Sequence, residues 1–203
     1  TIRAGISENS LAAEIDYKLR LKGGSGSSFA TIVASGPNSA IPHHQTSSRR
    51  LRAGEPVMLD FGVAMPSGYC SDLTRTIFVP GRKPNPKMIE IYKIVLGANE
   101  AAFKGLKPGL GWGEYDNIAR KYIKQHGYGD RFIHSLGHSL GLEPHDPCDY
   151  YTKPIQENMI ITDEPGIYIE GLGGVRIEDD VLITKKGAEK LTKAPYLKFP
   201  GTK

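Results

Sequence analysis

The stretch from Val57 to Val79, VMLDFGVAMPSGYCSDLTRTIFV, constrains the fold of this chain most strongly. Two runs rich in β-branched residues flank a turn at residues 66–68, a pattern that predicts a β-hairpin. Each run carries one aspartate, Asp60 and Asp72. A hairpin folded about residue 66 would place the two side chains opposite each other, with Cβ atoms about 5 Å apart. Two carboxylates at this separation repel each other, which predicts that a cation lies between them.

A second stretch, Met159 to Thr184, repeats this arrangement near the other end of the chain. Glu164 and Glu178 flank a glycine-rich turn at residues 171–174, and their midpoint is residue 171. A hairpin centred there would make these two side chains face each other as well. Four carboxylates that converge on one place predict a site for two divalent cations, which bridging carboxylates hold about 3.5 to 4 Å apart.

Histidines gather in the segment FIHSLGHSLGLEPHD, which contains His134, His138 and His145 among several glycines. A further histidine, His43, lies in a loop shortly before the first hairpin and could reach its open end. One imidazole added to four carboxylates favours manganese, cobalt or zinc over copper or an iron–sulfur cluster. The sequence therefore predicts a mixed oxygen and nitrogen ligand set.

Helical patterns occupy three other parts of the chain. Ser7 can cap a helix in which Leu11, Ile15 and Leu19 recur every four residues. Apolar stripes of helical spacing extend over residues 86–106 and 112–126, while residues 31–35 favour a strand. We interpret the later helices as the layer that covers a sheet, and the two hairpins as parts of a duplicated αβ unit.

The composition, 39% apolar and 24% charged over 203 residues, is typical of one globular domain. No apolar run approaches the roughly 20 residues of a membrane span, and no signal-peptide pattern occurs, so the expected location is the cytoplasm. Cys70 and Cys148 show no spacing that favours a disulfide. The only tight basic cluster, Arg49, Arg50 and Arg52, lacks interleaved aromatic residues, so we expect no nucleic-acid binding.

Six motifs occur together in this order: SGPNSAIPHH, LDFG, SDLTRT, GHSLGLEPHD, TDEPGIYI and VRIEDDVLIT. With them the chain resembles the pita-bread (creatinase/aminopeptidase) metallopeptidases over nearly its whole length. Within that group it is more similar to the Xaa-Pro peptidases, prolidase and aminopeptidase P, than to methionine aminopeptidases. The resemblance implies an α+β fold with a curved antiparallel sheet, covered by helices and duplicated about a pseudo-two-fold axis.

The resemblance also implies a ligand set for two divalent metal ions, manganese or cobalt, with zinc as the alternative. Asp72 and Glu178 would bridge the two ions. Asp60 would complete the shell of one ion, and His138 with Glu164 would complete that of the other.

Further roles follow from the same resemblance. Glu164 would also move a proton during the reaction. His43, His134 and His145 match histidines that line the substrate pocket and hydrogen-bond the substrate or the reaction intermediate. Arg176 matches an arginine that pairs with a ligand carboxylate and orients it.

The implied activity is hydrolysis of an Xaa-Pro bond in a peptide or dipeptide by a metal-bridging hydroxide. We expect residues 1–203 to form a single catalytic domain, without the N-terminal domain and first helix of the family, and the full-length protein to be a homodimer without membrane or nucleic-acid partners. One alternative is a methionine aminopeptidase, disfavoured by Asp179, where those enzymes usually have histidine. Another is a non-catalytic binding module on the same fold. Without the resemblance, an unrelated two-metal hydrolase such as a phosphatase would fit.

Overall fold

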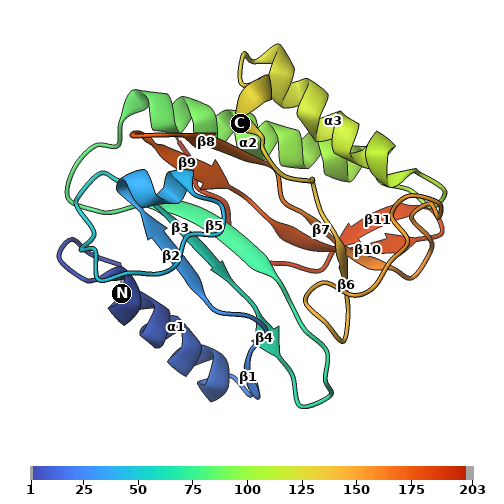
Figure 1. Ribbon diagram of the computed structural model, residues 1–203, viewed down its shortest axis with the longest axis horizontal. Coiled ribbons are helices and arrows are strands. Elements are labelled where there is room, and N and C mark those ends of the chain that lie inside the picture. The colour runs from blue at the N-terminus through green and yellow to red at the C-terminus, as the bar shows by residue number, and fades with distance from the viewer. Residues whose placement is uncertain (1, 200–203) are drawn as a thin grey trace.

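The computed structural model describes residues 2–199, in which three long helices are interspersed with short strands (Figure 1). In chain order the elements are α1 (Glu8–Leu21), β1 (Gly26–Ser27), β2 (Ile32–Ser35), the 3-10 helix η1 (Gly36–Ala40), β3 (Pro56–Phe61), β4 (Val63–Ala64), β5 (Leu73–Phe78), α2 (Pro86–Gly105), α3 (Trp112–Gln125), the 3-10 helix η2 (Gly129–Arg131), β6 (Ser139–Leu140), β7 (Ile160–Asp163), β8 (Gly166–Ile169), β9 (Gly173–Arg176), β10 (Asp179–Thr184) and β11 (Gly187–Lys190). The three predicted helices are confirmed, and the Ser7 hydroxyl caps α1 by accepting a bond from the Ser10 backbone N–H.

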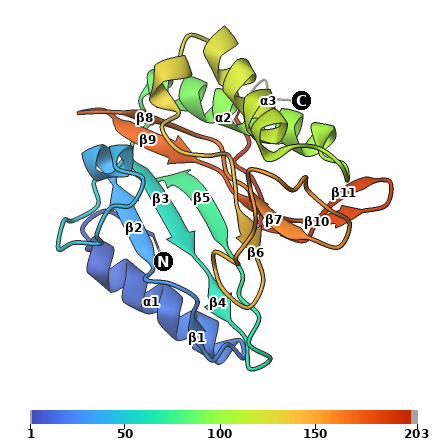
Figure 2. The same cartoon turned by 45° about the vertical axis from the view of Figure 1, so that its right-hand side comes forward.

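Every strand pairing in residues 2–199 is antiparallel, which confirms the predicted α+β class. The strands form a three-stranded sheet, β2–β3–β5, a four-stranded sheet, β11–β10–β7–β6, and the pairs β1–β4 and β8–β9. In Figures 1 and 2, α1 lies on one outer side of these strands and α2 with α3 on the other. No helix in the described part of the chain is both long and apolar enough to span a bilayer.

The first predicted hairpin forms, but its register differs from the prediction. Asp60 pairs with Thr74, so the expected pairing of Asp60 with Asp72 is wrong. The hairpin loop contains three residues, 66–68, and closes with Gly68 at φ 89°, the left-handed conformation that a three-residue hairpin loop requires. This loop moves the hairpin centre by one position along the chain. Asp72 therefore lies two residues before the partner of Asp60, on the same face and diagonal to it.

The second hairpin has the predicted register. In β8 and β9, Gly166 pairs with Arg176 and Ile169 with Gly173, so the hairpin is centred on residue 171. The Ile177 N–H donates to the Pro165 carbonyl and carries the same register one step beyond the strands. Glu164 and Glu178 thus leave the open end of the hairpin together.

The alternation of side chains along β3 separates the core from the site. Val57 and Leu59 point toward α1 and pack in one buried cluster with Leu11. Met58 points the other way and packs on Tyr168 of β8. Because Asp60 is two residues from Met58, it shares this inner face, where the two halves of the chain meet.

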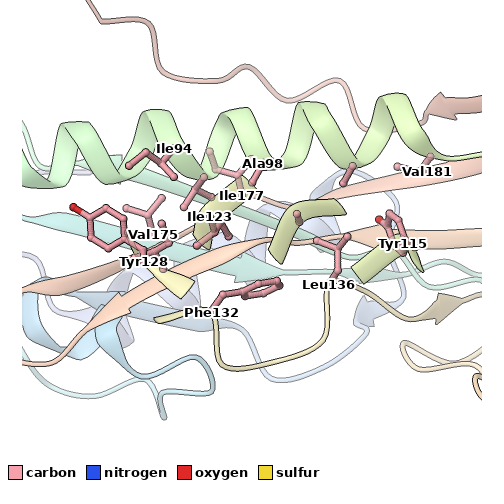
Figure 3. Packing of buried hydrophobic residues seen from close by; sticks show 14 of the residues in the cluster. Ile94, Ala98, Tyr115, Ile123, Tyr128, Phe132, Leu136, Val175, Ile177 and Val181 are labelled. Carbon is pink, nitrogen blue, oxygen red and sulfur yellow. The ribbon is translucent and has the colours of Figure 1, made fainter. Parts of the chain in front are cut away.

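The largest core lies between the helices α2 and α3 and the strands of the second half. Figure 3 shows Ile94 and Ala98 of α2 above Val175 of β9 and Ile177, which lies between β9 and β10, and Val181 of β10 belongs to the same cluster. All five side chains are buried. The helices therefore hold the strands that carry the second pair of carboxylates, without supplying any of the predicted metal ligands themselves.

Candidate metal centre

One cavity of ≈ 1300 Å³ lies between the two halves of the chain. Two aromatic residues line it, Trp112 of α3 and Tyr150, and their rings contact each other edge to face. All nine residues predicted to belong to the site line this cavity: His43, Asp60, Asp72, His134, His138, His145, Glu164, Arg176 and Glu178.

Two carboxylates of the site belong to the first hairpin, and backbone bonds to distant segments place the other two. Asp60 is in β3, and Asp72 comes directly before β5. The Glu178 N–H, between β9 and β10, donates to the Thr74 carbonyl of β5 at 3.0 Å. The Glu164 N–H, between β7 and β8, donates to the carbonyl of Leu136 in the histidine segment at 2.9 Å. The site therefore exists only where the two halves are joined.

Asp72, His138 and Glu178 form the centre of the cluster. One side-chain ligand atom from each of them lies within 4.8 Å of the other two. Glu164 adjoins this group, with its Oε1 atom 3.3 Å from His138 Nε2, and Asp72 Oδ2 is 3.7 Å from the same nitrogen. Asp60 lies in the same cavity, and its Oδ2 atom pairs with the guanidinium of Arg176 at 2.5 Å.

The carboxylates are crowded enough to disfavour their own charge. Burial, together with the charges of Asp60 and Glu164, raises the pKa of Asp72 to about 9. Burial raises the pKa of Glu164 to about 7, although the Arg176 guanidinium opposes this change. Burial and the neighbouring Asp72 charge also raise the pKa of Glu178 well above its usual value. Arg176 alone does not offset the repulsion among these carboxylates, so a bound cation would favour their ionised forms.

His138 presents a bare nitrogen to the carboxylates. Its Nδ1 atom lies 3.2 Å from the Ser139 carbonyl, which can only accept, so Nδ1 carries the proton and Nε2 holds a free lone pair. Burial lowers the pKa of His138 to about 4, which keeps the ring neutral. The Thr162 hydroxyl accepts the His138 N–H at 2.9 Å and donates to Glu164 Oε1 at 3.1 Å. Thr162 thus orients both residues.

Arg176 connects the carboxylates to the histidines. Besides pairing with Asp60, it donates from Nη1 to the Tyr168 hydroxyl at 3.0 Å. The Tyr168 hydroxyl lies 2.8 Å from His134 Nε2, and His134 Nδ1 lies 2.8 Å from the Ser135 carbonyl. The carbonyl fixes the proton on Nδ1, so Tyr168 donates to Nε2 and both ring nitrogens of His134 are engaged by the protein.

The other two histidines remain accessible from the cavity. His43 and His145 are exposed, and the ring of His145 stacks on that of His138, with centroids 3.7 Å apart. Partial burial and the neighbouring His43 lower the pKa of His145. Both side chains can therefore meet a ligand held next to the carboxylates.

Sequence reasoning missed three polar residues that hold this site together. Thr74 donates from its hydroxyl to Glu178 Oε2 at 2.7 Å, while Thr162 and Tyr168 make the bonds described above. All three stand in motifs of the sequence: Thr74 in SDLTRT, and Thr162 and Tyr168 in TDEPGIYI. Alternation along the strands could have indicated them, because each shares the face of a predicted site residue. Thr74 shares that of Asp72, Thr162 that of Glu164, and Tyr168 that of Arg176, which pairs with Gly166.

Residues 1–185 match the model of metallopeptidase family M24. The chain is 49% identical over 195 residues to a protein of Pyrococcus furiosus named Xaa-Pro dipeptidase, an alignment that covers 95% of this chain and 55% of the relative. It is 47% identical over 195 residues to the Xaa-Pro dipeptidase of Pyrococcus horikoshii, with the same coverage. The chain thus spans about half the length of the curated relatives it matches.

Solved structures show the same similarity. The prolidase from Pyrococcus furiosus superposes with a TM-score of 0.90 at 48% identity, covering 96% of this chain and 58% of that one. The X-Pro aminopeptidase from Thermotoga maritima superposes with a TM-score of 0.91 at 41% identity, covering 97% of this chain and 56% of that one. A dipeptidase and an aminopeptidase are therefore matched equally well in fold.

Proposed function

This chain belongs to metallopeptidase family M24 and has its pita-bread fold, and from this premise we propose that it is the catalytic part of a metal-dependent Xaa-Pro peptidase. The observation that carries the proposal is the convergence of Asp72, His138 and Glu178 ligand atoms within 4.8 Å, in the cavity that also contains Asp60 and Glu164. Relatives named Xaa-Pro dipeptidase support the choice of substrate bond. The proposed substrate is a peptide or dipeptide with proline in its second position.

The residues of the cavity fit a pair of divalent cations. In the described part of the chain, the buried Oδ1 atoms of Asp60 and Asp72 have no hydrogen-bond partner. A buried acceptor without a partner is costly, and a cation would satisfy it. The neutral His138 offers its Nε2 lone pair toward the same place. Carboxylate oxygens with one imidazole suit manganese or cobalt, which we propose as the metals, with zinc as the alternative.

We assign the ligands as the resemblance implies. Asp72 and Glu178 would bridge two ions, Asp60 would complete one, and His138 with Glu164 would complete the other. When bound, such ions supply Lewis acidity, which polarises a carbonyl and lets water act as a nucleophile at neutral pH.

The side chains of the protein supply the remaining steps. The Glu164 carboxylate accepts a proton from the water that attacks the carbonyl carbon, and it returns the proton to the departing proline nitrogen. His43 and His145 face the cavity and donate hydrogen bonds to the substrate oxygen on which negative charge develops. His134 shapes the pocket, because Tyr168 and Ser135 already bind its two nitrogens.

Our proposal of a proline substrate agrees with the chemistry of the Xaa-Pro bond. A peptide bond to proline has no N–H, so an enzyme that anchors this hydrogen cannot bind it productively. The walls of this cavity present rings, from His43, His145 and Trp112, that can contact the pyrrolidine without needing that donor. The methionine aminopeptidase alternative is not favoured, because Asp179 follows Glu178. The Asp179 carboxylate is buried and pairs with the side chains of Arg75 and Lys190. Cytoplasmic location and a homodimer of the full-length protein stay predictions.

Peptide hydrolysis tests the proposal directly. The metal-free protein is reconstituted with manganese or cobalt and offered Gly-Pro, Ala-Pro, a longer Xaa-Pro peptide and Met-Ala-Ser. We expect cleavage of the proline peptides, none by chelated protein, and loss of both activity and metal content in Asp72→Ala. Full activity of Asp72→Ala would refute the ligand assignment, whereas preference for Met-Ala-Ser would refute the substrate assignment.

A further inference from the structure

Arg75 lies outside the cavity and donates a hydrogen bond to the backbone at Glu178. Its Nη1 atom donates to the Glu178 carbonyl at 2.5 Å and to the Thr74 carbonyl at 3.0 Å. Thr74 in turn donates its hydroxyl to the Glu178 carboxylate. The Arg75 guanidinium therefore fixes the main chain of Glu178. It also fixes the main chain of Thr74, whose hydroxyl orients the Glu178 side chain.

The position of Arg75 depends on Asp179. Arg75 Nη2 donates to Asp179 Oδ1 at 2.7 Å, and the Asp179 side chain has 0% exposure. The other oxygen, Asp179 Oδ2, accepts bonds from Lys190 Nζ at 2.8 Å and from the Tyr196 hydroxyl at 2.6 Å. Lys190 also donates to Tyr196 and to Asn99 of α2. A buried carboxylate whose oxygens all have donors holds its partner in one geometry.

Part of this arrangement comes from the segment 191–197, which follows the last strand and lies outside the residues matched by the family model. The Arg75 guanidinium lies 4.7 Å from the centre of the Tyr196 ring, and its Nη2 atom donates to the Ala194 carbonyl at 2.9 Å. The Leu197 N–H donates to the Tyr92 hydroxyl of α2 at 2.9 Å. These contacts pack segment 191–197 against Arg75 and α2, behind the candidate metal centre as seen from the cavity.

We propose that Tyr196 is a positioning residue for the metal centre, acting on Glu178 through Asp179 and Arg75. The inference rests on the proposed function, because it treats Glu178 as a metal ligand. A ligand must be held to within about 0.5 Å of its productive place by the groups behind it. Loss of the Tyr196 hydroxyl leaves Asp179 Oδ2 with one donor fewer, so Asp179, Arg75 and the Glu178 main chain gain freedom.

The test measures manganese binding rather than turnover. Titration calorimetry on metal-free protein compares the wild type with Tyr196→Phe, which keeps the ring and removes only the hydroxyl, and with Tyr17→Phe, an exposed tyrosine of α1. Loss of an outer partner of a metal ligand commonly weakens metal binding about 10- to 100-fold. We expect about a tenfold increase in the Kd of Tyr196→Phe and none for Tyr17→Phe. Arg75→Lys, which keeps the charge but loses the fork, should also weaken binding.

Urea unfolding of the metal-free proteins separates positioning from a merely structural role. If Tyr196→Phe lost stability but bound manganese as tightly as the wild type, the proposal would be overturned while the proposed function stood. If the wild type itself bound neither manganese nor cobalt nor zinc, the proposed function would fail and this inference with it. Weaker manganese binding by Tyr196→Phe and Arg75→Lys, with Tyr17→Phe unchanged, supports the assignment.

Discussion

Replacing Glu8 with glutamine should destabilise the protein far more than its place on an N-terminal helix suggests. The Glu8 side chain has 0% exposure although it lies in the first turn of α1. Its oxygens accept bonds from the backbone and hydroxyl of Ser35, from the backbone and hydroxyl of Ser47, from Asn38 and from His44. One carboxylate thereby fastens α1 to both ends of the loop that carries His43.

The size of the effect follows from these partners. Glutamine keeps the shape but turns one oxygen into an NH₂ group, which faces the backbone N–H of either Ser35 or Ser47. A buried donor left unpaired costs about 1 to 3 kcal/mol, and the remaining bonds lose the strength that a charged acceptor gives them. We expect Glu8→Gln to lower the free energy of unfolding by about 3 kcal/mol. Glu100→Gln, the same change at an exposed position of α2, should alter it by less than about 0.5 kcal/mol.

The effect should also depend on pH with a definite sign. Burial alone would raise the pKa of Glu8, but the bonds from Ser47, Ser35 and His44 outweigh it and the pKa is lowered from 4.5. The stabilisation is therefore complete above pH 4.5 and is lost as the pH falls through the lowered folded-state pKa. Urea unfolding at pH 7 and at acidic pH measures both parts. A difference below 1 kcal/mol from wild type at pH 7, or one that grows on acidification, would refute the reasoning.

Two further substitutions probe the histidine segment. Gly137→Ala places a Cβ atom 2.0 Å from the Thr162 carbonyl oxygen and should cost about 3 kcal/mol of unfolding free energy, whereas Gly113→Ala in α3 meets nothing within 4 Å and should be neutral or slightly stabilising. Equal stability of the two variants in urea would contradict this. His145→Ala should slow turnover of Ala-Pro peptides while elemental analysis finds the metal content of wild type; a variant that loses its metal would show that His145 acts by orienting His138.

Local pattern is sufficient for the helices and for the second hairpin. Ser7 and the four-residue spacing after it specify α1, and Gly171 provides the positive φ that centres the β8–β9 turn. The first hairpin was misplaced because the turn signal at Pro66 and Gly68 does not distinguish a two-residue from a three-residue loop. One residue of loop length decides which side chain lies opposite Asp60.

The residues that hold the metal ligands in place could not be predicted from the sequence, for a different reason. Arg75 reads as a basic residue between two threonines of a strand, and its partner Asp179 lies 104 residues away. Nothing local distinguishes such a buried pair from two surface charges, because the pairing is created by the contact between the two halves of the chain. The metal ligands could be found because a strand carboxylate is unusual by itself, whereas the residues that hold them become visible only in the assembled structure.

The joining of Asp60 and Asp72 with Glu164 and Glu178 has a kinetic consequence. Since α2 and α3 separate these residues in the chain, we expect the ligand atoms to come together only after the most non-local contacts have formed. A cation that bridges the halves would find no site in an early collapsed state. It should therefore prolong the lifetime of the native protein against unfolding while leaving the refolding rate nearly unchanged.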